Sequence, residues 1–155
     1  MTPPHTLRPA RTSEQAALAA LWRAAWASAN PQAVAIEPQA HWLARVQREF
    51  GPPSQVLVID AGDRLLAFMV FDRQAGYLAQ LFVEPTAMGC GLGRRLLEEA
   101  TRRMPGGWHL HVATSNERAR RFYERRGLAA GPVSAHPTTG RERIEYRWQP
   151  AAAGP

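Results

Sequence analysis

The segment Leu81–Ala100, LFVEPTAMGCGLGRRLLEEA, constrains the fold of this chain more than any other. Its apolar run reaches Val83, and Pro85 stops it. Three glycines follow, at positions 89, 91 and 93. Apolar residues then recur at helical spacing from Leu92. Glycine lets the backbone approach a ligand closely, and the first turn of a helix presents unpaired amides at its positive end. The segment therefore predicts a strand, a loop and a helix with an anion site suited to phosphate, beside which Arg94 adds charge.

Two common phosphate loops are excluded by single residues. A dinucleotide-binding fingerprint requires glycine at position 94, where this chain has Arg94. A Walker loop ends in Gly-Lys-Ser/Thr, and all 19 basic residues of this chain are arginine. Taken alone, the glycines are also explained by ordinary turns.

A second informative segment is His111–Leu128, HVATSNERARRFYERRGL. Asn116 and Tyr123 are seven residues apart, which is close to two helical turns, so their side chains face the same way. Each has a structural explanation as well: Asn116 as a helix N-cap, and Tyr123 as a core residue with its hydroxyl at the rim.

Apolar periodicity predicts the remaining elements. Helices are expected over 12–30, 38–50, 92–104 and from 116 to 126, and strands over 5–10, 56–59, 65–71, 77–83, 108–112 and 143–148. The expected order is β-α-α-β-β-β-α-β-α-β-β, in which one of the last two strands has no assigned bounds. The strand–helix–strand step from 77 to 112 requires a parallel pair, and the strands between 56 and 83 follow one another as antiparallel neighbours.

The fold class is therefore α/β of the α+β type. We expect a mixed, mostly antiparallel central sheet of about seven strands with about four helices on its faces. At 155 residues the chain fits a single domain over 1–155, with 150–155 as a frayed tail.

Together, the two segments resemble the GNAT-superfamily N-acetyltransferases. Met88–Gly93 resembles that family's pyrophosphate loop, Gln/Arg-x-x-Gly-x-Gly/Ala, although Met88 replaces the usual Gln or Arg. The Val83–Pro85 sequence VEP before the loop, and the pattern N-x-x-A-x-x-F-Y-x-x-x-G-[FL] from Asn116, are also similar to the family.

The resemblance implies acetyl-CoA as co-substrate and an acyltransferase activity on a primary amine. By analogy, backbone groups of Leu81, Phe82 and Val83 would bind the pantetheine, with the Val83 amide on the acetyl carbonyl. The pyrophosphate would lie on Gly89, Cys90, Gly91, Leu92, Gly93 and Arg94. Asn116 would contact the pantetheine, and Tyr123 would act as general acid at the sulfur. The amine would attack directly in a ternary complex, and it would belong to a small molecule or a peptide N-terminus.

The general base is the open point. His111 is our candidate, because its ordinary pKa suits base work near neutral pH and a peptide-amine branch of the family carries a catalytic Glu at this spacing. Tyr77 and an ordered water are the alternatives. His109 shares the face of His111 but lies farther from Asn116. The loops 30–38 and 132–141 are expected to line the acceptor pocket.

The charge and the cysteine count limit the kinds of partner that we expect. A formal net charge of +6 favours anionic partners. We expect no nucleic-acid partner, since the arginines at 118–126 do not alternate with aromatics; the two aromatics in the run, Phe122 and Tyr123, are adjacent. We expect no metal, because the histidines and the single cysteine, Cys90, do not have the spacing of metal ligands. Without an apolar leader or an 18-residue apolar run, we expect a cytoplasmic protein that does not span a membrane.

Two further alternatives stay open. A homodimer is compatible with the sequence. A non-catalytic module that senses acetyl-CoA is the competing function, and Tyr123 favours the enzyme because a sensor needs no proton donor for a departing thiolate.

Overall fold

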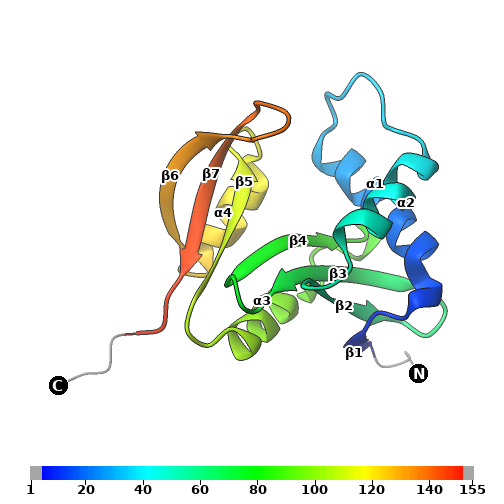
Figure 1. Cartoon of the computed structure of the whole chain (residues 1–155), viewed down its shortest axis with the longest axis horizontal. Helices are drawn as coiled ribbons and strands as arrows, with labels where there is room; N and C mark the ends of the chain where they lie inside the picture. The colour runs from blue at the N-terminus through cyan, green and yellow to red at the C-terminus, as the bar shows by residue number, and fades with distance from the viewer. Residues whose placement is uncertain (1–4, 152–155) are drawn as a thin grey trace.

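The computed structural model describes residues 5–151, which form one seven-stranded sheet with helices on both faces (Figure 1). The strands are β1 Thr6–Pro9, β2 Gln55–Asp60, β3 Leu65–Asp72, β4 Tyr77–Val83, β5 Trp108–Ala113, β6 Ala129–Ala135 and β7 Glu142–Trp148. The α-helices are α1 Gln15–Ala29, α2 Gln39–Glu49, α3 Leu92–Arg103 and α4 Glu117–Arg125. Short 3-10 turns cover Thr12–Glu14 and Pro85–Ala87. The expected fold class and element order are confirmed; residues 152–155 of the expected tail lie outside the described part.

The strand order across the sheet is β1-β2-β3-β4-β5-β7-β6. Every neighbouring pair is antiparallel except β4 and β5, which are parallel as predicted. The last strand, β7, inserts between β5 and β6. Strands that are not consecutive in the chain, β5 and β7, therefore lie side by side.

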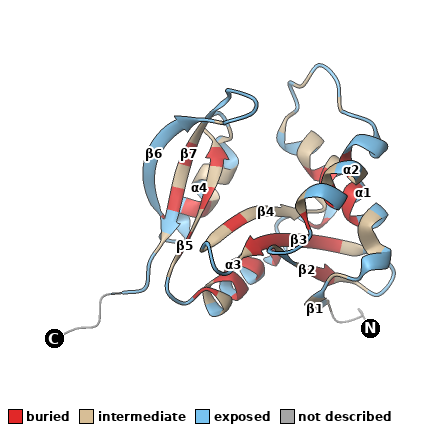
Figure 2. Cartoon of the chain, in the orientation of Figure 1, coloured by how far each residue is buried: buried red, intermediate tan, exposed pale blue. Residues whose placement is uncertain are grey.

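Two cores cover the two faces of the sheet. On one face, α1 and α2 pack Trp22 and Trp42 against Phe68 of β3. On the other face, α3 and α4 place Leu96 and Tyr123 among side chains of β2, β3 and β4 and of β5 and β7. The central part of β3 is buried throughout (Figure 2), as expected for a strand with helices on both sides.

The C-terminal edge corrects one expectation. We expected 132–141 as a loop, but β6 extends through Ala135, so only the second part of that range connects two strands. All seven residues of β6 are exposed. Pro132 removes one backbone donor from this edge, which disfavours pairing with another chain.

The sheet opens between β4 and β5. These strands pair at a single position, Tyr77 with His109, and diverge beyond it (Figure 1). The register of β4 against β3 also shifts at this end, since Val70 pairs with Gln80 and Phe71 with Leu78. Ala79 is thus an extra residue in β4, a bulge that bends the strand away from its neighbour. Within residues 5–151, each helix is too short or too polar to cross a membrane.

Candidate functional site

Backbone amides of β4 point into the opening between β4 and β5. The Glu84 N–H donates to the Leu66 carbonyl at 2.7 Å, which fixes the side of β4 that pairs with β3. Backbone groups of successive residues in a strand point to opposite sides, so the amides of Val83 and Leu81 face away from β3. The strand offers these donors where β5 has moved away. Of the three β4 residues predicted to bind pantetheine, Phe82 has its backbone groups on the β3 side.

The glycine loop is open at its backbone. Gly89 and Gly91 have φ angles of +84° and +82°, and a Cβ atom at either position would meet no atom within 4 Å. Gly91 is the N-cap of α3, and no side chain caps this end. The first amide to bond within the helix is that of Arg95, to the Gly91 carbonyl at 3.0 Å. The three amides before it have no intrahelical partner, so the loop fits a phosphate group.

The remaining loop residues differ in their environment. Leu92 is buried in the core, so only its backbone is available to a ligand. A Cβ atom at Gly93 would lie 3.0 Å from the Phe122 ring, so a side chain here would press on that ring where α3 packs on α4. Cys90 is exposed, and the exposed Arg94 pairs with Glu98 at 3.1 Å.

Asn116 and Tyr123 both have structural contacts. The Asn116 side chain caps α4 by accepting from the Ala119 amide at 3.2 Å. Its amide nitrogen makes no hydrogen bond to any described residue. Tyr123 is 8% exposed, beside Phe122 and Tyr146. Burial raises the pKa of Tyr123 well above its ordinary value, so the hydroxyl keeps its proton at neutral pH.

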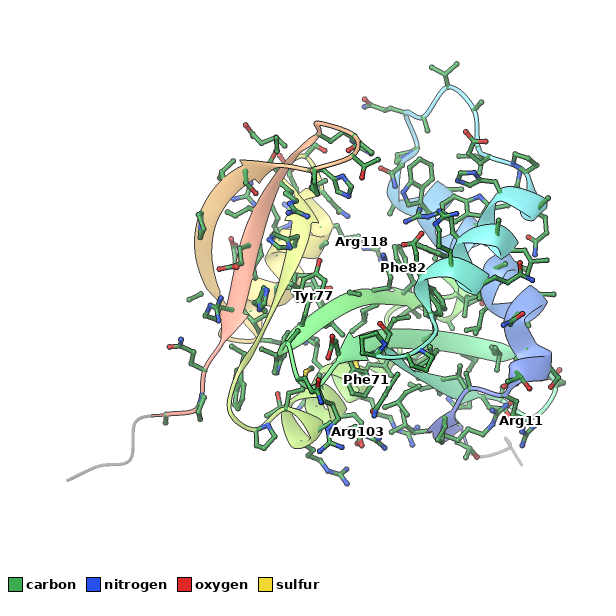
Figure 3. The ribbon with its side chains drawn as sticks, in the orientation of Figure 1. Arg11, Phe71, Tyr77, Phe82, Arg103 and Arg118 are labelled. Carbon is green, nitrogen blue, oxygen red and sulfur yellow. The ribbon has the colours of Figure 1, made fainter. Side chains whose placement is uncertain are left out.

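The two candidates for the base lie together. The Tyr77 hydroxyl is 3.2 Å from His111 Nδ1, and the Tyr77 ring also packs against His109 (Figure 3 shows Tyr77 between β4 and β5). Burial, followed by the charge of Arg143, lowers the pKa of His111, so the imidazole is neutral at neutral pH. Burial raises the pKa of Tyr77, which therefore remains protonated. Tyr77 suits a role as hydrogen-bond partner of His111 better than a role as base.

Sequence reasoning missed Arg143 and Glu145. In β7, Glu145 pairs with His111 and Arg143 with Ala113, so both lie beside the candidate base. Their alternation with apolar residues was visible in the sequence, but their neighbours depend on the insertion of β7 next to β5. No group of three His, Cys, Asp or Glu side chains that could hold a metal occurs among the described residues.

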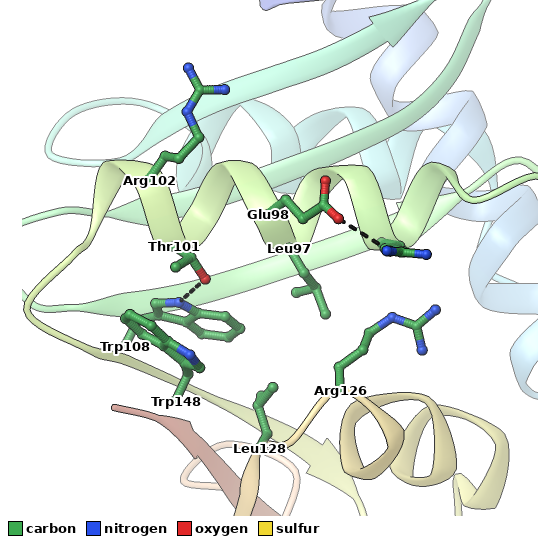
Figure 4. A pocket seen from close by; sticks show the side chains of 9 residues that line it. Leu97, Glu98, Thr101, Arg102, Trp108, Arg126, Leu128 and Trp148 are labelled. Carbon is green, nitrogen blue, oxygen red and sulfur yellow. Dashed lines mark hydrogen bonds and ion pairs between the residues drawn. The ribbon is translucent and has the colours of Figure 1, made fainter. Parts of the chain in front are cut away.

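A pocket of about 350 Å³ lies on the face of the sheet that α3 and α4 cover, between α3 and the strands β5 and β7 (Figure 4). Its lining residues are Arg94, Leu97, Glu98, Thr101, Arg102, Trp108, Arg126, Leu128 and Trp148. Only Arg94 belongs to the predicted site. The pocket is therefore adjacent to the glycine loop and distinct from the opening between β4 and β5.

Comparison with known proteins places this geometry in a family. Residues 16–128 match the acetyltransferase (GNAT) family. A mycothiol acetyltransferase of Kineococcus radiotolerans is 33% identical over 128 residues, which cover 76% of this chain and 42% of that protein. The chain thus spans less than half the length of this curated relative.

Solved structures show the same fold. An acetyltransferase from Thermus thermophilus superposes with a TM-score of 0.74 at 16% identity, covering 96% of this chain and 98% of that one. The paia N-acetyltransferase from Thermoplasma acidophilum, in complex with coenzyme A, gives a TM-score of 0.71 at 18% identity, covering 94% of this chain and 99% of that one.

Proposed function

Because this chain belongs to the GNAT acetyltransferase family, we propose that it transfers the acetyl group of acetyl-CoA to a primary amine by direct attack in a ternary complex. The observation that carries the proposal is the opening between β4 and β5. Free amides of β4 face this opening, and the loop that follows β4 leads into the phosphate-compatible start of α3.

The backbone would hold the co-substrate. The amides at the start of α3 and the open loop at Gly89 and Gly91 suit the pyrophosphate, while the exposed Arg94 adds charge. The free amide of Val83 suits the acetyl carbonyl, where negative charge develops when the amine attacks. The backbone amides compensate for Met88, which offers no polar group in place of the usual Gln or Arg.

Two side chains would manage the protons. The amine nitrogen forms a bond to the acetyl carbon and loses a proton to His111, while the carbon–sulfur bond breaks and the thiolate takes a proton from Tyr123. For this role His111 must leave Nε2 unprotonated. The Tyr77 oxygen would favour that tautomer by accepting a hydrogen bond from Nδ1–H.

A melting and thiol-release experiment tests the proposal. Acetyl-CoA should raise the melting temperature through mass action on the folded state, and coenzyme A should slow maleimide labelling of the exposed Cys90. A screen of amino acids, polyamines, aminoglycosides, peptide N-termini and the acceptor of the mycothiol acetyltransferases should then yield thiol release with at least one amine. A protein that binds acetyl-CoA but acetylates none of them would be a sensor module.

A further inference from the structure

We propose that the acceptor carries a carboxylate within a few bonds of its amine, and that Arg143 binds this carboxylate. The inference rests on the proposed acetyl transfer and narrows its acceptor. Arg143 would be a residue that determines specificity, separate from the groups that handle protons.

The strand register places Arg143 next to the candidate base. Arg143 pairs with Ala113, and Glu145 pairs with His111. Ile144 and Tyr146 are buried among the side chains of α3 and α4, so Arg143 projects from the opposite face, which carries His111. Diagonal neighbours across a strand pair are about 7–8 Å apart at Cα, a span that an arginine side chain bridges.

The guanidinium of Arg143 lacks an ionic partner within the described chain. Its Nε is buried without a hydrogen bond, and the group makes no ion pair with any residue between 5 and 151. The nearby carboxylates are engaged elsewhere: Glu145 pairs with Arg147 at 3.5 Å, and Glu142 accepts from the Thr114 hydroxyl at 2.9 Å. An unsatisfied buried donor destabilises the free protein, and a bound acceptor group would satisfy it.

Carboxylate is the chemistry that fits this guanidinium. Its planar fork of donors matches a carboxylate in a two-bond arrangement. The same positive charge disfavours acceptors with several ammonium groups, because their second charge would lie beside a guanidinium. Since Arg143 is so near His111, the carboxylate must be close to the amine. Small amino acids meet this condition, whereas the N-terminus of a folded protein does not.

Matched amines test the proposal directly. β-Alanine and propylamine have primary amines on chains of similar length, but only β-alanine has a carboxylate. Wild-type kcat/KM should be about 10- to 100-fold higher for β-alanine, the range expected for a charged hydrogen bond. Arg143→Gln should remove this preference by raising KM for β-alanine, with little change for propylamine. Arg143→Lys should restore part of it. Arg125→Gln, the same change of charge on exposed α4, is the control.

A binding measurement tests the role of Arg143 without requiring turnover. With coenzyme A present, β-alanine should raise the melting temperature of the wild type but not of Arg143→Gln, and propylamine should raise neither. Failure of acetyl transfer with this pattern intact would contradict the proposed function alone. Equal use of both amines by the wild type would overturn the assignment of Arg143. An equal loss for both amines in Arg143→Gln, together with a shifted pH profile, would overturn it too, since Arg143 would then act only on the pKa of His111.

Discussion

Tyr123 and His111, the proposed acid and the proposed base, lie on opposite faces of the half-sheet beside the opening. Tyr123 belongs to the core under α3 and α4, while His111 projects from the other face. Burial holds the pKa of Tyr123 far above neutral, so its hydroxyl is protonated over the whole useful pH range. Tyr123→Phe should lower kcat by about 10²–10⁴-fold.

Fold and binding should survive this change, because one hydroxyl is removed and the ring remains. The melting temperature and its increase with acetyl-CoA serve as controls. A wild-type rate in Tyr123→Phe would assign the proton at sulfur to water.

His111 should set the lower limb of the pH profile. Because burial and Arg143 lower its pKa, kcat/KM should rise with pH through an inflection below the ordinary histidine value of about 6.5. His111→Ala should lose this limb, and its defect should shrink at high pH, where more acceptor amine is already neutral. The measurement is kcat/KM against pH with an identified amine. A lower limb that persists in His111→Ala would return this histidine to a structural role.

At the scale of the element, the start of α3 should be sensitive to a side chain at its N-cap. Gly91→Asp would place a carboxylate where phosphate is expected and should abolish most of the thermal shift with acetyl-CoA. Gly62→Asp is the matched control, because Gly62 also has a positive φ, +100°, with no atom within 4 Å of a Cβ, but lies in the β2–β3 turn. Equal thermal shifts in the two variants would place the phosphate elsewhere.

Local patterns were sufficient to predict most elements and the position of the glycine loop. Strand β4 and helix α3 follow from apolar runs bounded by Pro85 and the glycines. Strand β6 could not be bounded, because an exposed edge of small residues has no alternation to detect. The packing role of Gly93 was also hidden, since it depends on Phe122, which lies in a different helix.

The neighbours of His111 depended on topology rather than on local pattern. Strand β7 is the last in the chain, yet it lies between β5 and β6 and brings Arg143 beside the histidine. Such pairing between distant segments is set by burial of both sheet faces. A single sequence gives no signal for it.

For the whole molecule, the sheet consists of two halves joined at one strand pair. The strand sets β1–β4 and β5–β7–β6 pair through their backbones at Tyr77 and His109, while the core under α3 and α4 contains side chains of both halves. The opening thus exists without loss of a continuous core. Stability and access to the site are consequently supplied by different parts of the fold: helices hold the halves together on one face, and the divergent strands expose backbone donors.

Far from the opening, an ion cluster ties the N-terminal strand to the sheet and should control acid stability. Arg8 pairs with Glu14 at 2.6 Å and with Asp60 at 3.0 Å. The hydrogen bonds from Arg8, despite partial burial, lower the pKa of Glu14 to about 2 from its ordinary 4.5. A carboxyl group whose pKa is lowered by folding stabilises the fold at pH values above its pKa in the unfolded state. This stabilisation is lost as the pH falls through its pKa in the folded state.

Glu14→Gln should therefore lower the free energy of unfolding by about 1–3 kcal/mol at pH 7, and the difference from wild type should vanish between about pH 4.5 and 2. Urea unfolding at several pH values measures this, with Glu98→Gln as control, because its exposed pair with Arg94 should contribute about 0–1 kcal/mol. A deficit in Glu14→Gln that stayed constant down to pH 2 would show that the lost stability comes from packing and not from the charge of Glu14.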